Sequence, residues 1–291
     1  AAGVHEPGMS KARSEPASES SAPQLSPKEF RHFQQFIYEV AGINMSEAKQ
    51  ALVGGRLAGR LKHYGFQDYQ QYFEYINPRQ TGEDNVRERQ MAVDLLTTNE
   101  TYFFRETKHF DYLVAQFLPK CQKGPLRFWS AACSSGEEAY TLAMILAEHC
   151  PTPDWEILGT DISSRMVEAA RRAQYPMARA DKIPKHYLHR YCFKGTGSKQ
   201  GTLLVDSALR AKTRFEYGNL KQSADQLGQF DVIFLRNVLI YFNQETKQQT
   251  VQLVSQQLKP GGLLLIGHSE SLNGVTTALE QVQPAVYRKR G

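Results

Sequence analysis

The stretch LRFWSAACSSGEEAYTLAMIL, residues 126–146, decides the fold. Its first part is an apolar run typical of a buried strand, and its last part carries apolar residues at helical spacing. The turn at 134–136 lies between them and opens directly into two carboxylates, Glu137 and Glu138. A strand, a tight turn and a helix in this order are typical of a nucleotide-binding α/β fold. Most of the glycines of a phosphate-binding loop are missing, so the identity of the ligand is open.

Strands and helices continue to alternate on the C-terminal side of this stretch. The predicted strands are WEILGTD (155–161), FDVIFLRN (230–237) and LLLIGHSE (263–270). The predicted helices are SSRMVEAARRAQY (163–175) and NQETKQQTVQLVSQQL (243–258), and KPGG (259–262) is a predicted turn. The strands show little alternation, which indicates burial on both faces and therefore a mostly parallel sheet with helices on each side. Ligands of such sheets bind at the carboxyl ends of the strands.

The composition is that of a globular protein, with 41% hydrophobic and 22% charged residues in a chain of 291. Apolar runs are shorter than a membrane span and no signal-peptide pattern opens the sequence, so we expect no membrane insertion. The 4 cysteines form no CxxC pairs, so we expect no metal site and a reduced, cytoplasmic protein. The net charge of +5 is compatible with nucleic acid, an anionic cofactor or an acidic protein partner.

The N-terminal third of the chain differs from the rest in composition and in its predicted secondary structure. Residues 1–25 are rich in Ala, Ser, Pro and Glu, so we expect a disordered tail in which 1–8 include a remnant of cloning. The stretch that follows predicts a helix, with Ser26 as N-cap, Pro27 at the first helical position and Glu29 at the third. Further helices are expected at about 46–63, 67–76 and 84–97. We therefore expect a helical domain at 26–97, a linker and first helix at 98–125, and a sheet domain at 126–291.

Three polar residues follow predicted strands, where a ligand would bind: Glu137, Asp161 and Asn237. The GxGxxG spacing is missing and the two adjacent carboxylates would repel phosphate, which argues against a dinucleotide. S-adenosylmethionine has a ribose diol, an ammonium and a sulfonium, which suit these carboxylates better. Asp161 follows Gly136 at a spacing close to that of a second-strand acid that binds ribose hydroxyls. The alternative is that Asp161 only caps the following helix.

Five motifs in this order resemble the CheR family. They are TTNETYFFRE (97–106), WSAACSSGEEAY (129–140), GTDIS (159–163), FDVIFLRNVLIYF (230–242) and KPGGLLLIGHSES (259–271). CheR proteins are S-adenosylmethionine-dependent methyltransferases that esterify glutamates on bacterial chemotaxis receptors, the reaction of sensory adaptation. The resemblance implies a class I methyltransferase of the α/β class, Rossmann-like with a mostly parallel sheet. It also implies an N-terminal all-α domain and a small antiparallel β insertion, which fits the stretch at about 175–212.

The resemblance also implies the contacts to the cofactor and to its product, S-adenosylhomocysteine. They are Asn99, Thr101 and Arg105 in the linker motif, and Glu137, Asp161, Asn219, Leu220, Asn237 and Val238 in the sheet domain. Arg105 can bind the methionine carboxylate with both guanidinium nitrogens, and the alternative is a surface ion pair with Glu106 or Asp111. Glu100 departs from the neutral residue of the family pattern, and we expect its side chain to face solvent.

The implied chemistry needs no general base. A glutamate with a reference pKa of about 4.3 is ionised at neutral pH and can attack a methyl group directly. The protein must hold the two reactants in line and exclude water. Arg105 and Tyr241 are the candidate catalytic residues, because the Tyr241 hydroxyl could orient the incoming carboxylate. The alternative for Tyr241 is aromatic packing beside Phe242.

Two features are candidates for binding the receptor. Lys49, Arg56, Arg60 and His63 lie within about 60° of one another on the second predicted helix and form a basic stripe. The family uses a basic helix of this domain against the glutamate-rich cytoplasmic helices of chemoreceptors, although such a stripe can also be a solvated face. In the insertion, KGTGSKQG (194–201) matches the longer loop of family members that capture a receptor C-terminal peptide at a strand edge. The alternative is an ordinary hairpin.

Other functions are less consistent with the sequence. GHSES (267–271) places His268, Ser269 and Glu270 too close in the chain for a hydrolytic triad, and no GxSxG elbow is present. Methylation of nucleic acid is disfavoured because RNVLIY stands where amino-methylating enzymes carry an Asn/Asp-Pro-Pro-aromatic run, so we expect no nucleic-acid partner. A methyltransferase for another protein and a cofactor-free receptor-binding module remain as alternatives.

Overall fold

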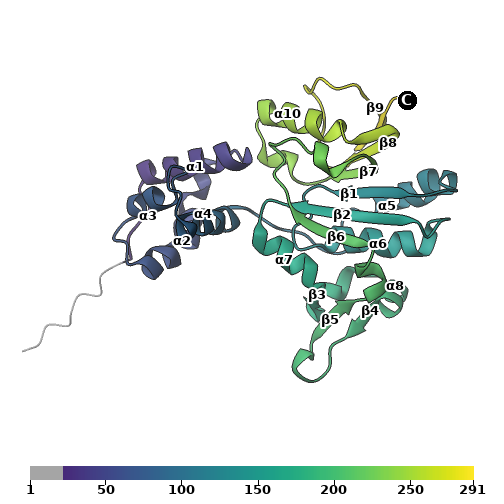
Figure 1. Ribbon diagram of the computed structural model, residues 1–291, viewed down its shortest axis with the longest axis horizontal. Coiled ribbons are helices and arrows are strands. Elements are labelled where there is room, and N and C mark those ends of the chain that lie inside the picture. Colours follow the sequence, from purple (N-terminus) through teal and green to yellow (C-terminus); the bar gives the residue numbers. More distant parts are fainter. Residues whose placement is uncertain (1–21) are drawn as a thin grey trace, which may run out of the picture.

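The computed structural model describes residues 22–291, which form a helical part and a larger sheet part (Figure 1). The predicted disordered tail, residues 1–25, lies mostly outside the described residues. Leu25 lies within them, and its side chain is buried in the helical core while Gln50 donates a hydrogen bond to its carbonyl. The helical domain therefore begins before the predicted boundary at Ser26.

The helical domain consists of α1 (Pro27–Ala41), α2 (Gln50–Tyr64), α3 (Tyr69–Ile76) and α4 (Glu83–Leu96). The capping box predicted for α1 is present, because Ser26 and Glu29 each accept a hydrogen bond from the other's amide. α2 starts after a 3-10 turn, η1 (Glu47–Lys49), so it begins later than predicted. The apolar faces of these helices meet in one core, as their helical periodicity predicts.

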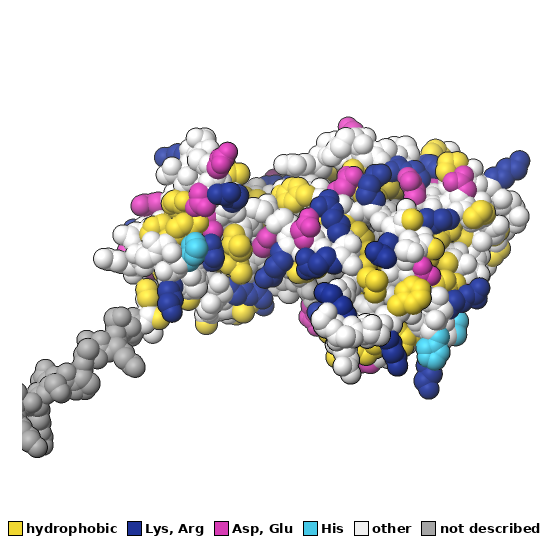
Figure 2. All heavy atoms as spheres, turned by 60° about the horizontal axis from the view of Figure 1, so that its bottom comes forward, with side chains coloured by type: hydrophobic (Ala, Val, Ile, Leu, Met, Phe, Trp, Pro, Cys, Tyr) yellow, Lys and Arg dark blue, Asp and Glu magenta, His cyan; other side chains and the backbone are white. Residues whose placement is uncertain are grey.

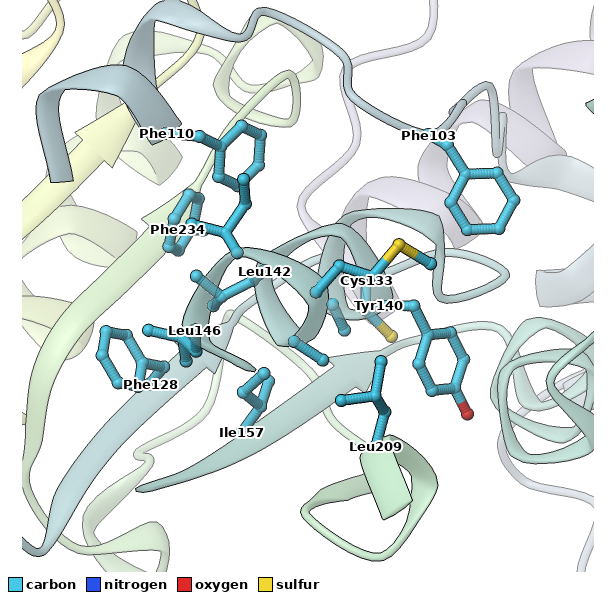
Figure 3. Close-up of a cluster of buried hydrophobic side chains, with 14 of the residues drawn as sticks. Phe103, Phe110, Phe128, Cys133, Tyr140, Leu142, Leu146, Ile157, Leu209 and Phe234 are labelled. Atoms are coloured by element: carbon cyan, nitrogen blue, oxygen red, sulfur yellow. The ribbon is translucent and has the colours of Figure 1, made fainter. Parts of the chain in front are cut away.

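The linker is anchored to the sheet domain by two buried aromatic side chains. Phe103 meets Tyr175 edge to face at 5.0 Å between ring centroids. Phe110 stacks on Phe234 at 5.6 Å between ring centroids (Figure 3). The chain then runs through α5 (Lys108–Tyr112), a π-helical turn η2 (Leu113–Phe117) and a 3-10 turn η3 (Leu118–Lys120). The segment between the two aromatic anchors, which includes Arg105, is thereby held against the sheet.

The main sheet has the strand order β6-β2-β1-β7-β8-β10-β9. Its strands are β1 (Leu126–Ser130), β2 (Trp155–Asp161), β6 (Thr213–Tyr217), β7 (Phe230–Leu235), β8 (Leu258–Ile266), β9 (Leu279–Gln283) and β10 (Val286–Lys289). The first five strands in the order pair in parallel, and β10 and β9 pair antiparallel at one edge. The predicted mostly parallel sheet is confirmed.

Helices cover both faces of this sheet, as the strand burial predicts. α6 (Glu137–His149) and α7 (Ser164–Arg172) pack with α5 on one face, and α10 (Gln244–Ser255) packs on the other. The predicted turn KPGG lies inside β8, where Gly261 has a φ of 81° and the pairing with β7 shifts register after Phe230. The glycines therefore form an irregularity within the strand instead of ending it.

A second, smaller sheet has the order β3-β5-β4 and is antiparallel throughout. It comprises β3 (Gln174–Pro176), β4 (Cys192–Lys194) and β5 (Thr202–Val205). It is accompanied by η4 (Met177–Lys182), α8 (Lys185–Tyr191), η5 (Gly197–Lys199) and α9 (Ser207–Arg210). The predicted insertion is confirmed, with β3 as a strand that the two predicted β-rich runs did not include. Buried residues of this sheet join the core on the α6 face.

The helical domain contacts the sheet domain at several places, which include a backbone hydrogen bond from the Asn44 amide to the Tyr241 carbonyl and the following two contacts. At the first, Asn219 and Lys221 donate hydrogen bonds to backbone carbonyls at the C-terminal end of α1. At the second, Asp94 of α4 accepts from the amides of Ser164 and Arg165 and so caps α7 across the domain boundary. Within residues 22–291, every helix is too short or too polar to span a bilayer.

Candidate active site

A cavity of about 400 Å³ lies where the helical domain covers the carboxyl ends of the parallel strands. The ends of β1, β2, β6 and β7 form its floor, the linker forms one wall, and the start of α2 with the loop before it forms the roof. The predicted site residues that line it are Asn99, Thr101, Arg105, Asp161, Asn219, Leu220, Asn237, Val238, Tyr241, Lys49 and Arg56. Of the predicted set, Glu137, Arg60 and His63 do not line it.

Asp161 ends β2 and is buried, with 7% of its surface exposed. Its two carboxylate oxygens accept hydrogen bonds from the amides of Ser134 and Ser163, each at 3.0 Å. The N-cap of α7 is Ser163, which excludes helix capping as the role of Asp161. Burial, together with the charge of Asp94, raises the pKa of Asp161 from 3.8 to about 6. Each oxygen can accept a further hydrogen bond from a ligand hydroxyl in the cavity.

The turn after β1 brings the start of α6 close to the cavity. Ser134 has a φ of 48° and Gly136 a φ of 98°, both in the left-handed region. A Cβ on Gly136 would lie 2.9 Å from the Cβ of Ala170 and from the Tyr175 hydroxyl, so only glycine fits this close approach.

The two carboxylates after this turn point to different places. The side chain of Glu137 is fully buried away from the cavity, where Ser135 and Arg179 donate hydrogen bonds to it. Glu138 lines the cavity instead, and it accepts hydrogen bonds from the Ser130 hydroxyl and Arg236. The resemblance pointed to Glu137, but the structure places Glu138 and not Glu137 in the lining of the cavity. One step along a helix turns a side chain by about 100°, and the sequence alone does not say which of two neighbours faces the ligand.

In the linker, Arg105 is half-buried and its guanidinium donates to the carbonyl of Glu100 at 3.0 Å. It also lies over the Tyr102 ring, with 5.5 Å from Cζ to the ring centroid. Within residues 22–291 Arg105 forms no ion pair, because Glu106 contacts Arg236 instead. The alternative of a surface ion pair is therefore wrong, and most of the guanidinium donors remain available. Glu100 is exposed, as expected.

At the end of β7, Arg236 lies beneath the cavity with only 1% of its side chain exposed. Its guanidinium contacts Glu138 at 2.9 Å and the Glu106 carboxylate at 3.6 Å, and donates to Nδ1 of His109 at 2.8 Å. Arg236 was not among the site residues predicted from the sequence. The signal was a charged residue directly after the apolar run VIFL (232–235), in the motif FDVIFLRN.

His109, Glu106 and His268 come close enough together to suggest a metal site, with ligand atoms within 4.8 Å of one another. Burial and the neighbouring charge of Arg236 lower the pKa of His109 to about 3, so its ring is neutral. Its Nδ1 accepts from the Arg236 guanidinium, which leaves no lone pair on that nitrogen. The positive charge of Arg236 also disfavours a cation here, and the rings of His109 and His268 stack on each other with 4.5 Å between their centroids.

Asn237 has a φ of 61° and is held by glutamates on both sides. Its amide donates to Glu270 at 2.6 Å and its side-chain nitrogen donates to Glu106 at 3.3 Å.

Tyr241 lies in a 3-10 turn, η7 (Leu239–Tyr241), and its carbonyl accepts a hydrogen bond from the amide of Asn44 in the helical domain. Burial raises the pKa of Tyr241, so its hydroxyl keeps its proton at neutral pH.

The predicted basic stripe on α2 is not a uniform exposed surface. Arg60 forms a two-point ion pair with Glu88, with both distances 2.7 Å and the Glu88 side chain only 4% exposed. Arg56 donates to the carbonyls of Leu95 and Thr97 at the end of α4. Lys49 and His63 are the exposed members of the stripe. Helical periodicity predicts that all four residues lie on one side of α2. It carries no information on Glu88 of α4, the acid that pairs with Arg60.

Comparison with known proteins identifies the two parts of the chain. Residues 28–97 match the all-alpha domain of CheR methyltransferases, and residues 99–288 match the SAM binding domain of CheR methyltransferases. The chain belongs to the CheR methyltransferase family. Its sheet part is therefore the S-adenosylmethionine-binding domain of a methyltransferase, and the predicted CheR resemblance and cofactor are confirmed.

Relatives in several bacteria match nearly the full length of the chain. A "Chemotaxis protein methyltransferase" of Borreliella burgdorferi is 37% identical over 267 residues, 88% of this chain and 92% of that protein. The protein of the same description from Escherichia coli is 37% identical over 252 residues, 86% of each chain. That from Salmonella typhimurium is 35% identical over 266 residues, 90% of each chain. These relatives support a role for this chain in chemotaxis.

Proposed function

We propose that this protein transfers the methyl group of S-adenosylmethionine to glutamate side chains on the cytoplasmic helices of bacterial chemoreceptors. The product is a glutamate methyl ester, and the proposed role is sensory adaptation. The observation that carries the proposal is the cavity, in which the binding domain of a methyltransferase and the start of α2 meet around Arg105 and Tyr241. The methyltransferase relatives of the chain support the same reaction.

The donor set of the cavity fits the cofactor. Asp161 has acceptor capacity for the ribose hydroxyls, and Arg105 has guanidinium donors for the methionine carboxylate. We infer that Asn99, Thr101, Asn219, Leu220, Asn237 and Val238 complete the contacts, because all of them line the same cavity. We infer that Glu138, in place of Glu137, is the acidic contact, because its carboxylate lines the cavity and suits the ammonium group of the cofactor.

When bound, S-adenosylmethionine supplies an electrophilic methyl group, and the side chains of the cavity must bring a carboxylate to it. The Tyr241 hydroxyl keeps its proton and can donate a hydrogen bond to the incoming carboxylate. Arg105 adds a positive charge beside the same cavity. The helical domain covers the cavity and excludes water, which strengthens both interactions. No group has to accept a proton, because the glutamate is already ionised at neutral pH.

The rim of the cavity favours a protein substrate over nucleic acid. Leu52 and Ile240 line the cavity, and their surfaces are 40% and 57% exposed. Exposed apolar side chains at a binding site are typical of protein contacts. A receptor helix presents apolar and acidic side chains together and fits such a rim better.

The proposed reaction is tested by transfer of a radiolabelled methyl group from S-adenosylmethionine to a purified receptor cytoplasmic domain, with RNA and DNA as parallel substrates. We expect label in the receptor only, and we expect mild base to release it as methanol, as carboxyl esters require. Label in nucleic acid, or base-stable label in protein, would contradict the proposal. Calorimetric titration with S-adenosylhomocysteine separates an enzyme from a cofactor-free module, which would give no heat of binding.

The small sheet supports a second contact with some receptors. Among residues 22–291, β4 pairs with β5 alone, so its other edge has free backbone groups, and Phe193 on this strand is 58% exposed. We infer that a receptor C-terminal peptide adds to this edge as a further strand and raises the local concentration of substrate. Titration with a panel of receptor C-terminal peptides checks this. If none binds while the receptor is still methylated, the edge has no tethering role.

A further inference from the structure

A second groove opens beside the active-site cavity, on the other side of the linker. Its volume is about 540 Å³, and α4, α7 and the start of the small sheet form its walls. Arg56, Thr97 and Asn99 line both the groove and the cavity. A molecule that lies in the groove can therefore extend to the cavity across the linker.

The groove is positively charged. Arg165 on α7 is exposed and forms no ion pair with any residue between 22 and 291. Arg179 is 47% exposed, and only one of its terminal nitrogens is engaged, by Glu137. The one acid in the lining, Asp94, is buried and uses its oxygens to cap α7. Figure 2 shows Lys and Arg side chains gathered on this face, where the helical part meets the sheet part.

The remaining lining is largely apolar, with Leu95, Met166, Ala169 and Pro176 beside the polar Ser135 and Gln174. A surface that combines apolar walls with arginines at its edge is complementary to an amphipathic segment that carries acidic side chains. The groove is less suited to a free phosphate, because two of its three arginines already donate to protein groups, Arg56 to backbone carbonyls and Arg179 to Glu137.

We propose that this groove binds the acidic receptor helix next to the glutamate that is methylated, with Arg165 as its main electrostatic contact and Arg179 as a second. The inference rests on the proposed function and names a surface for its substrate. On α2, Arg60 is paired with Glu88 and Arg56 donates to the carbonyl of Leu95, so only part of the predicted basic stripe is free to bind a receptor. Positive charge for an acidic helix therefore comes from Arg165 on α7 and Arg179 on η4 as well.

The test compares Arg165→Glu with Arg172→Glu, which makes the same charge change on the same helix. Arg172 is exposed, does not line the groove and has no ion pair among the described residues, so it is a matched control. At low ionic strength we expect kcat/KM for the receptor domain to fall about tenfold or more in Arg165→Glu, through KM, and to stay near wild type in Arg172→Glu. The dissociation constant for S-adenosylhomocysteine should be unchanged in both variants. For Arg165→Ala, we expect kcat/KM to lie between the values of the wild type and Arg165→Glu.

Salt gives a second readout. In the wild type, kcat/KM should fall as NaCl is raised, and this dependence should weaken in Arg165→Ala because one screened contact is gone. Equal kcat/KM in Arg165→Glu and Arg172→Glu, while the wild type methylates the receptor, would contradict binding of the receptor helix in the groove. The proposed function would not be affected by this result. If the wild type itself fails to methylate any receptor, the proposed function fails instead. We avoid Arg179 as the test position, because its loss would leave the buried Glu137 unpaired.

Discussion

The guanidinium of Arg236 and the carboxylate of Glu138 form an ion pair beneath the cavity, with 2.9 Å between Nε and Oε2 and exposed side-chain fractions of 1% and 12%. The pair joins the end of β7 to the first turn of α6. Arg236 also donates to the carbonyl of Glu106 at 3.2 Å, which ties the linker to the same point. One buried side chain thus fixes three of the segments that surround the cavity.

Replacement of Arg236 by Met should destabilise the protein strongly. It leaves the carboxylates of Glu138 and Glu106 largely buried without their cation, and loss of one partner of a buried pair costs about 3–5 kcal/mol. Urea denaturation measures the change in the free energy of unfolding. Arg214→Met is the control, because the Arg214–Glu216 pair is 60% and 40% exposed and should contribute at most about 1 kcal/mol. Similar losses in both variants would contradict the role of the buried pair.

Replacement of Asp161 by Ala should weaken binding of both S-adenosylmethionine and S-adenosylhomocysteine. The two ligands share the ribose, and loss of a buried hydrogen-bond partner costs about 1–3 kcal/mol. Isothermal titration of each ligand gives the change. Wild-type affinity in the variant would remove Asp161 from the site.

The pH dependence of cofactor binding gives an independent test of the same residue. The pKa of Asp161 is raised to about 6, so its proton is bound more tightly in the native state than in the unfolded chain. Ionisation of Asp161 therefore lowers stability above about pH 6, and protonation relieves this cost as the pH falls towards 3.8. The affinity for the cofactor should change with pH in the opposite direction to stability, because protonation of Asp161 removes an acceptor for the ribose hydroxyls.

We therefore expect the dissociation constant of S-adenosylhomocysteine to rise as the pH falls through about 6, the pKa of Asp161. Calorimetric titrations without receptor isolate this effect from ionisation of the substrate glutamate. Asp161→Asn should bind more weakly and lose the pH dependence in this range. If the asparagine variant keeps the wild-type profile, another group is responsible for it.

Much of this organisation could be predicted from the sequence, because the decisive signals are local. The capping box at Ser26, the strand ends at Asp161 and Asn237 and the apolar periodicity of α1 each depend on neighbours in the chain. Glu137 and Arg60 show the limit of such reasoning. Whether Glu137 or Glu138 faces the cavity depends on Arg179 and Arg236, which lie far away in the sequence. The partner of Arg60 lies on another helix.

That partner changes what a substitution of Arg60 should do. Arg60→Glu would place a second negative charge against Glu88, which is 4% exposed and also accepts from the Tyr72 hydroxyl. We expect a loss of about 3–5 kcal/mol in the free energy of unfolding, measured by urea denaturation. Lys49→Glu is the matched change at an exposed position of the stripe and should stay within about 0.5 kcal/mol of wild type. A wild-type unfolding curve for Arg60→Glu would mean that the pair does not form.

Tyr241 lines the cavity and has a fixed backbone. The amide of Asn44 donates to its carbonyl at 2.8 Å, so the helical domain helps to set the position of the ring. Burial and the charge of Glu100 raise the pKa of Tyr241, so at neutral pH the hydroxyl is a donor that can meet the carboxylate of the substrate. A hydrogen bond to a charged group contributes about 1.5–3 kcal/mol.

Replacement of Tyr241 by Phe should therefore lower kcat for receptor methylation by about ten- to a hundredfold, with tenfold for every 1.4 kcal/mol lost. The dissociation constant for S-adenosylhomocysteine should stay at the wild-type value, because the ring and its packing remain. Tyr102→Phe provides the control, since Tyr102 is 41% exposed and does not line the cavity. Receptor methylation assays and calorimetric titration with both variants measure the two quantities. Equal kcat in Tyr241→Phe and Tyr102→Phe would assign Tyr241 to aromatic packing beside Phe242.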